Sequence, residues 1–133
     1  MTPGGAPGLR SLLNPRSSPW QQVAGHRDVA VAIKDTLSVA GDLTVQVGRN
    51  SSLTVTANQT LTVEKNLTIK ANKQLRIIAA DSLVLVCGDA SIVLKKDGSI
   101  QIRGKDISIA GSGKVDLKAS GDVVIKGSKI SQN

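Results

Sequence analysis

The sequence predicts an all-β protein built from a short repeat of strand and turn, and three observations support this fold class. Pairs of branched aliphatic residues, two positions apart, return about every eight positions between Val29 and Ile125. Such partners share one face of a strand, because side chains alternate across its two faces. Asp, Asn or Gly stands before most pairs, and these residue types accept tight turns. No proline follows Pro19, as expected where ladders need every backbone N–H. A sustained short repeat of this kind is typical of a β-solenoid.

The first element, residues 1–24, is a lead rich in Pro, Gly and Ser that we expect to be extended or a linker. A helix is expected only at Arg10–Leu13. Trp20 closes the lead, either as a plug packed on the first strands or as a contact to an upstream domain. Residues 25–133 form the second element, the repeat itself.

Within the repeat, the expected inward positions are odd-numbered from Val29 to Cys87, and the even positions between them are mostly Thr, Ser, Lys, Arg and Gln. The parity becomes even for Ile92–Ile102 and odd again from Ile107. A one-residue slip inside a strand would turn its apolar set outward, so each change must fall at a corner. The expected corners are residues 87–90 and residues 104–106, where glycine permits positive backbone angles.

The composition indicates a narrow interior shared by several chains. The 133 residues include no Phe, no Tyr and one Trp, although compact cores normally use aromatic side chains. Each repeat offers two or three inward aliphatics, worth about 1.5–3 kcal/mol each when buried. Ordering eight residues costs about 1.5 kcal/mol apiece, so one chain gains little by folding alone.

We therefore predict an intertwined parallel homotrimer, a triple-stranded β-helix with an octad repeat. The expected trimer core is Val45, Val47, Leu53, Val55, Leu61, Val63, Leu75, Ile77, Leu83, Leu85, Ile100, Ile102, Ile107, Ile109, Val115, Leu117, Val123 and Ile125.

The charge and cysteine content exclude several classes. The net charge of +7 is spread along the chain, and the aromatic residues that stack on nucleic-acid bases are missing, so solvated lysines on outward faces are expected. One cysteine cannot form an intrachain disulfide. No stretch reaches the length of a membrane span or reads as a signal peptide. Export, if it occurs, is expected by a route other than general secretion.

No catalytic, cofactor or metal site is expected. His26 is the single histidine and has no second ligand beside it, and Cys87 is expected as a reduced core thiol, with a threefold metal site as the alternative. Residues 111–114 lack the full spacing of a phosphate loop and are expected to form a turn. Asp116 and Asp122 are expected at outward and corner positions, where an acid/base role is improbable. The chain is therefore not expected to be an enzyme.

The last turn is the expected partner site, because it leaves open strand edges at the end of the repeat. Its residues are Lys126, Gly127, Ser128, Lys129, Ile130, Ser131, Gln132 and Asn133.

Three segments carry a family resemblance: DLTVQVGRN (42–50), SLTVTANQTLTVEKNLTIKAN (52–72) and LKKDGSIQIRGKDISIAGSGKVDLKASGDVVIKGSKI (94–130). They resemble the C-terminal needle of VgrG proteins, the valine-glycine-repeat spikes of the type VI secretion system, which are similar to phage tail spikes. The resemblance covers about residues 25–133. It implies a trimeric prism that punctures a target membrane in transient contact.

The resemblance also implies partners and a location. A conical PAAR-repeat protein is expected on the C-terminal end, with secreted effectors riding on either component, and the inner tube is reached through a base domain absent from this sequence. The protein is expected in the cytoplasm before firing and in the target cell afterwards. The alternative function is a self-assembling β-solenoid filament or adhesin stalk, which would form long fibres.

Overall fold

The computed structural model describes residues 21–133 of a chain that divides into two units, Met1–Gln59 and Thr60–Asn133. The described residues contain three strands and no helix: β1 (Ser82–Cys87), β2 (Ala90–Lys95) and β3 (Ile100–Arg103). The predicted all-β class is confirmed at this level. No helix within these residues is long and apolar enough to cross a membrane. The expected helix at Arg10–Leu13 and the position of Trp20 lie outside the described residues.

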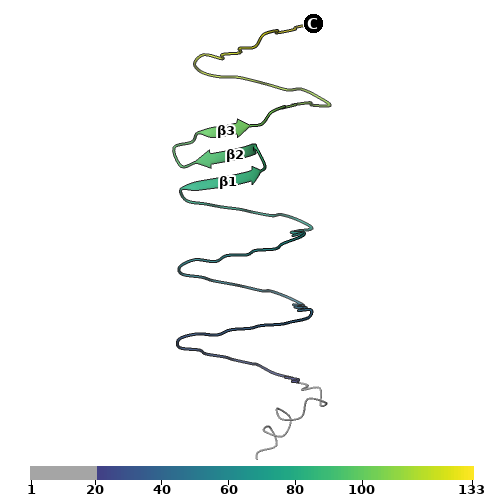
Figure 1. Ribbon diagram of the computed structural model, residues 1–133, viewed down its shortest axis with the longest axis vertical. Helices are drawn as coiled ribbons and strands as arrows, with labels where there is room; N and C mark the ends of the chain where they lie inside the picture. The colour runs from purple at the N-terminus through teal and green to yellow at the C-terminus, as the bar shows by residue number, and fades with distance from the viewer. Residues whose placement is uncertain (1–20) are drawn as a thin grey trace, which may run out of the picture. The chain divides into compact units, whose positions relative to one another are not determined.

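The three strands form one antiparallel sheet in the order β1-β2-β3, drawn as arrows in Figure 1. Leu85 faces Ile92 in the first pairing, and Ile92 faces Ile102 in the second. Residues directly opposite one another in a ladder lie on the same face of the sheet. The aliphatic pairs of the three strands therefore gather on one face.

The turn between β1 and β2 consists of Gly88 and Asp89, with Cys87 facing Ala90. Gly88 has φ of 54° and Asp89 has no positive φ, as in the two-residue turn that matches the twist of a hairpin. The predicted corner at residues 87–90 is confirmed in its position. The expected course of the chain was wrong, because the chain reverses here in a hairpin and does not continue round a coil.

The turn between β2 and β3 follows the sequence Lys-Asp-Gly-Ser. The Gly98 N–H donates to the Lys95 carbonyl and the Lys95 N–H donates to the Ser99 carbonyl, both at 3.0 Å. Gly98 has φ of 87°, the left-handed geometry that closes a three-residue hairpin loop. Asp97 Oδ1 accepts hydrogen bonds from the Ser99 N–H at 2.9 Å and the Ser99 hydroxyl at 2.6 Å.

Outside the sheet, bends divide the chain at regular positions. In the first unit they fall at 24–25, 32–33, 40–41, 48–49 and 56–57, and in the second at 64–65, 72–73, 80–81, 105–106, 112–113, 120–121 and 128. The two hairpin turns, near 88 and 96, keep the same interval of eight. The second expected corner is confirmed by the bend at 105–106.

One detail of the predicted repeat needs correction. Asn50, Asn58 and Asn66 were expected to form turns, but each follows a bend instead of occupying it. Ile33 lies in the bend at 32–33 and stays a predicted inward residue. The physical reason is that the bend positions follow the strand length, so residue types that favour turns sit near each bend without always forming it.

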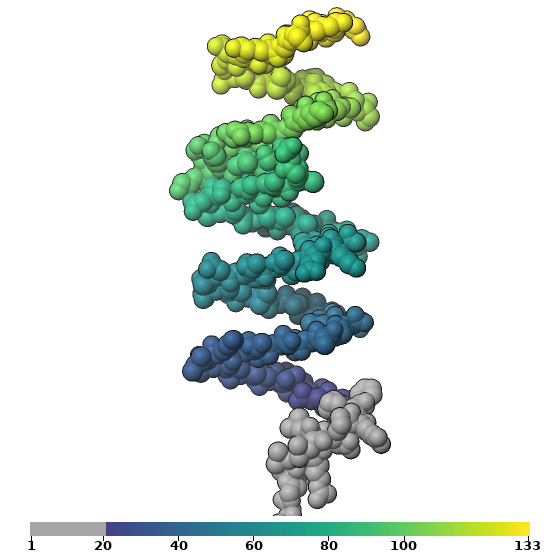
Figure 2. All heavy atoms as spheres, viewed as in Figure 1, coloured from purple at the N-terminus to yellow at the C-terminus, as the bar shows by residue number. Residues whose placement is uncertain are grey.

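The segments expected as strands on either side of residues 82–103 are extended but have no ladder partner in the described chain. A strand is defined by its pairing, and one copy of these segments offers nothing to pair with. In the second unit, Figure 2 shows the atoms of 82–103 in one continuous layer, with open space between the passes of chain on either side.

Candidate functional site

Each extended segment of the two units carries an uncovered aliphatic face, formed by its aliphatic side chains at alternate positions. No residue between 21 and 133 is buried. The chain exposes 14907 Å² of accessible surface, whereas a compact monomer of 13.8 kDa would expose about 6,600 Å². A soluble monomer rarely leaves an extended apolar surface open to water, so this face is a candidate binding surface.

The predicted core residues lie on this surface. All of them are exposed in the single chain except Leu83, which is half-buried, and Val45 and Ile109 are 77% and 78% exposed. The sheet brings Leu83 and Leu85 together with Ile100 and Ile102 through β2. The other predicted core residues are not brought together by one chain.

The sheet places Ile92 and Leu94 at its centre. Ile92 faces Leu85 and Ile102, and Leu94 faces Leu83 and Ile100. Both stand at even positions where the sequence predicts inward residues, although the list of expected core residues lacks them. The hairpin gives the reason for the change of parity, because residues that face each other in β1 and β2 have opposite parity.

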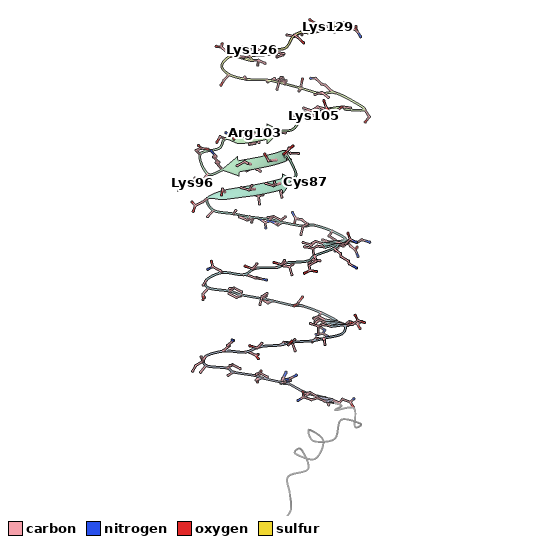
Figure 3. The ribbon with its side chains drawn as sticks, viewed as in Figure 1. Cys87, Lys96, Arg103, Lys105, Lys126 and Lys129 are labelled. Carbon is pink, nitrogen blue, oxygen red and sulfur yellow. The ribbon has the colours of Figure 1, made fainter. Side chains whose placement is uncertain are left out.

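An open hollow of about 470 Å³ lies on the end of this face next to the β1–β2 turn, and its lining includes Leu85, Ile92, Ile102 and Ile107. Cys87 and Ala90 also line it. Ser91, Arg103, Asp106 and Ser108 add polar groups to its lining. The aliphatic residues from all three strands make the hollow continuous with the uncovered aliphatic face. Cys87 is free and exposed at the end of β1, labelled in Figure 3, rather than in a core formed by one chain.

The opposite face of the sheet is the feature that the sequence analysis missed. Val84 faces Val93, and Val86 follows on β1 next to Val84. The signal is a run of apolar residues at both parities, Leu83-Val84-Leu85-Val86, where other segments alternate with polar residues.

The predicted tip residues, 126–133, are all exposed and contain a bend at Ser128. The only carboxylates in ion pairs among the described residues are Asp81 and Asp116, so Lys126 and Lys129 have no ion-pair partner there. Figure 3 labels both lysines on the last pass of the chain. The end of the chain is thus open and basic, with Ile130 exposed beside them.

The remaining candidate residues form no cluster. His26 is exposed, and no group of three potential metal ligands occurs among residues 21–133. Asp116 Oδ2 forms ion pairs with Lys114 Nζ at 2.8 Å and with Lys118 Nζ at 3.4 Å, and all three side chains are exposed. Residues 112–113 form a bend, and a Cβ at Gly111 would lie 2.8 Å from Val115 Cγ2, so this glycine permits a close approach.

One titratable group has a resolved perturbation. The Ser99 hydroxyl, followed by the Ser99 backbone N–H, stabilises the carboxylate of Asp97 and lowers its pKa from the ordinary value of 3.8. Asp97 is fully exposed, so this arrangement serves the turn between β2 and β3.

In comparisons with known proteins, no family model and no curated protein matches this chain.

Proposed function

We propose that residues 25–133 of three identical chains assemble into a membrane-puncturing spike like those of type VI secretion systems. The observation that carries this proposal is the uncovered aliphatic face, which recurs between bends spaced eight residues apart. The resemblance of residues 42–72 and 94–130 to VgrG needles supplies the identity of the machine and the number of copies.

The exposed aliphatics support self-assembly because their positions repeat regularly. Residues at the same place in successive repeats, such as Leu53, Leu61 and Ile69, would each meet identical residues of other copies at the same height. Each aliphatic side chain transferred from water contributes about 1.5–3 kcal/mol. Because the repeat brings many such residues, association offsets the ordering cost that one chain cannot offset alone.

The unpaired backbone supports the same conclusion. Extended segments such as residues 107–111 and 115–119 have no ladder partner in the described chain, and buried N–H and C=O groups need one. Strands of two further copies would pair with them and close the open edges. The antiparallel sheet at 82–103 is the exception, since there one chain provides three neighbouring strands itself.

The mechanism of such a spike is mechanical. The shaft would resist buckling under an axial load because ladders run along it around an apolar axis. No proline after Pro19 interrupts these ladders. The contracting machine supplies the work, so the needle needs no catalytic group. Outward Thr, Ser and Lys side chains keep the shaft soluble before firing.

Residues 126–133 are the proposed attachment site for a PAAR-repeat tip protein, and effectors would travel on the tip or on the shaft. Lys126, Lys129 and Ile130 are exposed there, on unpaired chain that could add a strand to a sheet of the partner. The inner tube would be reached through a base domain, and the target membrane only in passing.

The first experiment measures the mass of the native assembly by sedimentation at micromolar concentration. Three chains per particle, with short rods in electron micrographs, are expected. A stable folded monomer would contradict the proposal, and long fibres would favour a self-polymerising filament or stalk.

The second experiment tests the tip. Deleting residues 127–133 is expected to abolish binding of a purified PAAR-repeat protein while the particle keeps three chains. Ser108→Ala, on the shaft, serves as the matched control and should bind the cap normally. Unchanged binding by the deletion variant would refute the assignment of the tip.

A further inference from the structure

The sheet at 82–103 has a second apolar surface, on the face opposite Leu83, Leu85 and Ile92. We call it the valine face and define it by Val84, Val86 and Val93. Val84 and Val93 are directly opposed in the ladder, and Val86 lies two positions along β1 on the same side. Val84 and Val86 are 53% and 68% exposed, and Val93 is half-buried.

The valine face is set apart from the outward positions elsewhere in the repeat. The corresponding even positions are mostly polar, as in Thr54, Thr62 and Thr68. Outward aliphatics outside the sheet, such as Ile78 and Val124, stand singly. The group of three on one pleated surface is therefore a small apolar patch that the polar outward positions of the other repeats lack.

The cations beside the valine face indicate the charge of its partner. In the ladder, Lys95 faces Ser82 in the row before Val84, and Arg103 faces Ser91 in the row of Val86. Neither cation makes an ion pair within residues 21–133, although the neighbouring Lys96 pairs with Asp81 at 3.2 Å. The Arg103 guanidinium makes only a long hydrogen bond to Gln101, at 3.5 Å.

We propose that the valine face is a docking site for a protein partner that presents apolar side chains bordered by carboxylates. This inference rests on the proposed trimer, because burial of the opposite, aliphatic face leaves the valine face on the outside of the shaft. Apolar contact at the centre with opposite charges at the rim is the usual composition of a protein interface.

The charges and composition of the chain disfavour other occupants. Residues 1–20 carry Arg10 and Arg16 and no acid, so they do not complement Lys95 and Arg103. A second assembly of this chain has the same positive sign, at +7 per copy. An anionic lipid surface is favoured by aromatic anchors, and the only aromatic residue of the sequence is Trp20.

The test uses the assembled protein and two labelled synthetic peptides of equal length, one alternating valine with glutamate and one alternating valine with lysine. Fluorescence anisotropy is expected to show that the acidic peptide binds and the basic peptide does not. The double variant Val84→Thr/Val86→Thr keeps the β-branched shape of both side chains. It is expected to weaken binding about tenfold, because two partly buried methyl contacts are lost. Arg103→Gln should weaken it about threefold at low salt.

Val124→Thr is the matched control, since it alters a single outward valine away from the sheet, and it should leave binding unchanged. Equal binding of both peptides, no binding by the unaltered protein, or unchanged binding by the double variant would overturn the proposal. Binding to vesicles of anionic phospholipid without binding to the acidic peptide would assign the face to membranes and also overturn it. The mass of each variant is measured in parallel: three chains without peptide binding refute this inference alone, whereas the absence of three chains refutes the proposed function.

Discussion

Residues 82–103 and residues 107–125 carry the same aliphatic repeat and use it differently. In the first region the pairs Leu83/Leu85 and Ile92/Leu94 face each other across a ladder within one chain. In the second, Ile107/Ile109 and Val115/Leu117 lie on extended chain with no partner among the described residues. The aliphatic pattern thus fixes which side chains share a face of a strand, whereas the turns decide which strands pair.

The turns of the two regions differ in backbone geometry. Gly88 and Gly98 have positive φ and reverse the chain, while among the described glycines no other has positive φ. The bends at 112–113 and 120–121 redirect the chain without a hairpin. We therefore expect the first region to hold its own hydrogen bonds and the second to obtain them from other copies.

The largest expected effect comes from a charge in the second region. In the proposed trimer, Ile109→Asp would place three identical carboxylates at one height of an apolar axis, at a cost of several kcal/mol, and is expected to abolish assembly. Ser108→Asp, on the other face of the same segment, should assemble normally. Sedimentation at micromolar concentration distinguishes the two, and an intact trimer of Ile109→Asp would show that this position is not axial.

A smaller effect is expected from the hairpin in the first region. Gly98→Val puts a β-branched residue at φ of 87° and should destabilise the turn by about 1–3 kcal/mol per copy. Gly98→Asn should cost less, because Asn tolerates this backbone region. No atom lies within 4 Å of an added Cβ, so the penalty comes from the backbone alone. Hydrogen exchange of the β3 amides provides the measurement, and equal protection in Gly98→Val and the unaltered protein would contradict the assigned geometry.

A pH effect is expected at the same turn. The Asp97 pKa is lowered in the folded chain, so its stabilising contribution is present above about pH 4, the range of the unfolded pKa. That contribution is lost as the pH falls through the lower, folded pKa. The pH titration of the Ser99 amide resonance, which follows the Asp97 carboxyl, should have its midpoint below the ordinary pKa of 3.8. In Ser99→Ala, the midpoint of the Asp97 side-chain carboxyl titration should rise toward 3.8. A midpoint at or above 3.8 in the unaltered protein would argue against these hydrogen bonds.

The smallest effect is expected from the ion pair between Lys96 and Asp81. Its side chains are 74% and 83% exposed, so solvent screens the attraction. Lys96→Gln should change the free energy of unfolding by at most about 0.5 kcal/mol at low salt, and by nothing measurable at 1 M salt. Chemical denaturation measures this free energy, and Lys105→Gln serves as the control. A larger loss of stability that does not depend on salt would place the ion pair in a buried interface.

Much of the fold was predictable from the alternation of residues. The all-β class, the interval of eight and both changes of parity follow from where Leu85, Ile92 and Ile107 stand in the sequence. The valine face and the hairpin sheet that places β2 between β1 and β3 were not predicted. Those features need the strand register, which local alternation leaves open.

The sequence by itself determined that aliphatic residues recur at alternate positions and therefore share one face of each extended segment. Only the tertiary structure decided that the chain reverses at Gly88 and Gly98, and that Val84, Val86 and Val93 meet on one side of a sheet. The physical reason is that period-two alternation fixes the face of each side chain, while its neighbours depend on strand direction. Strand direction is set by backbone angles in two short turns, and glycine permits several of them.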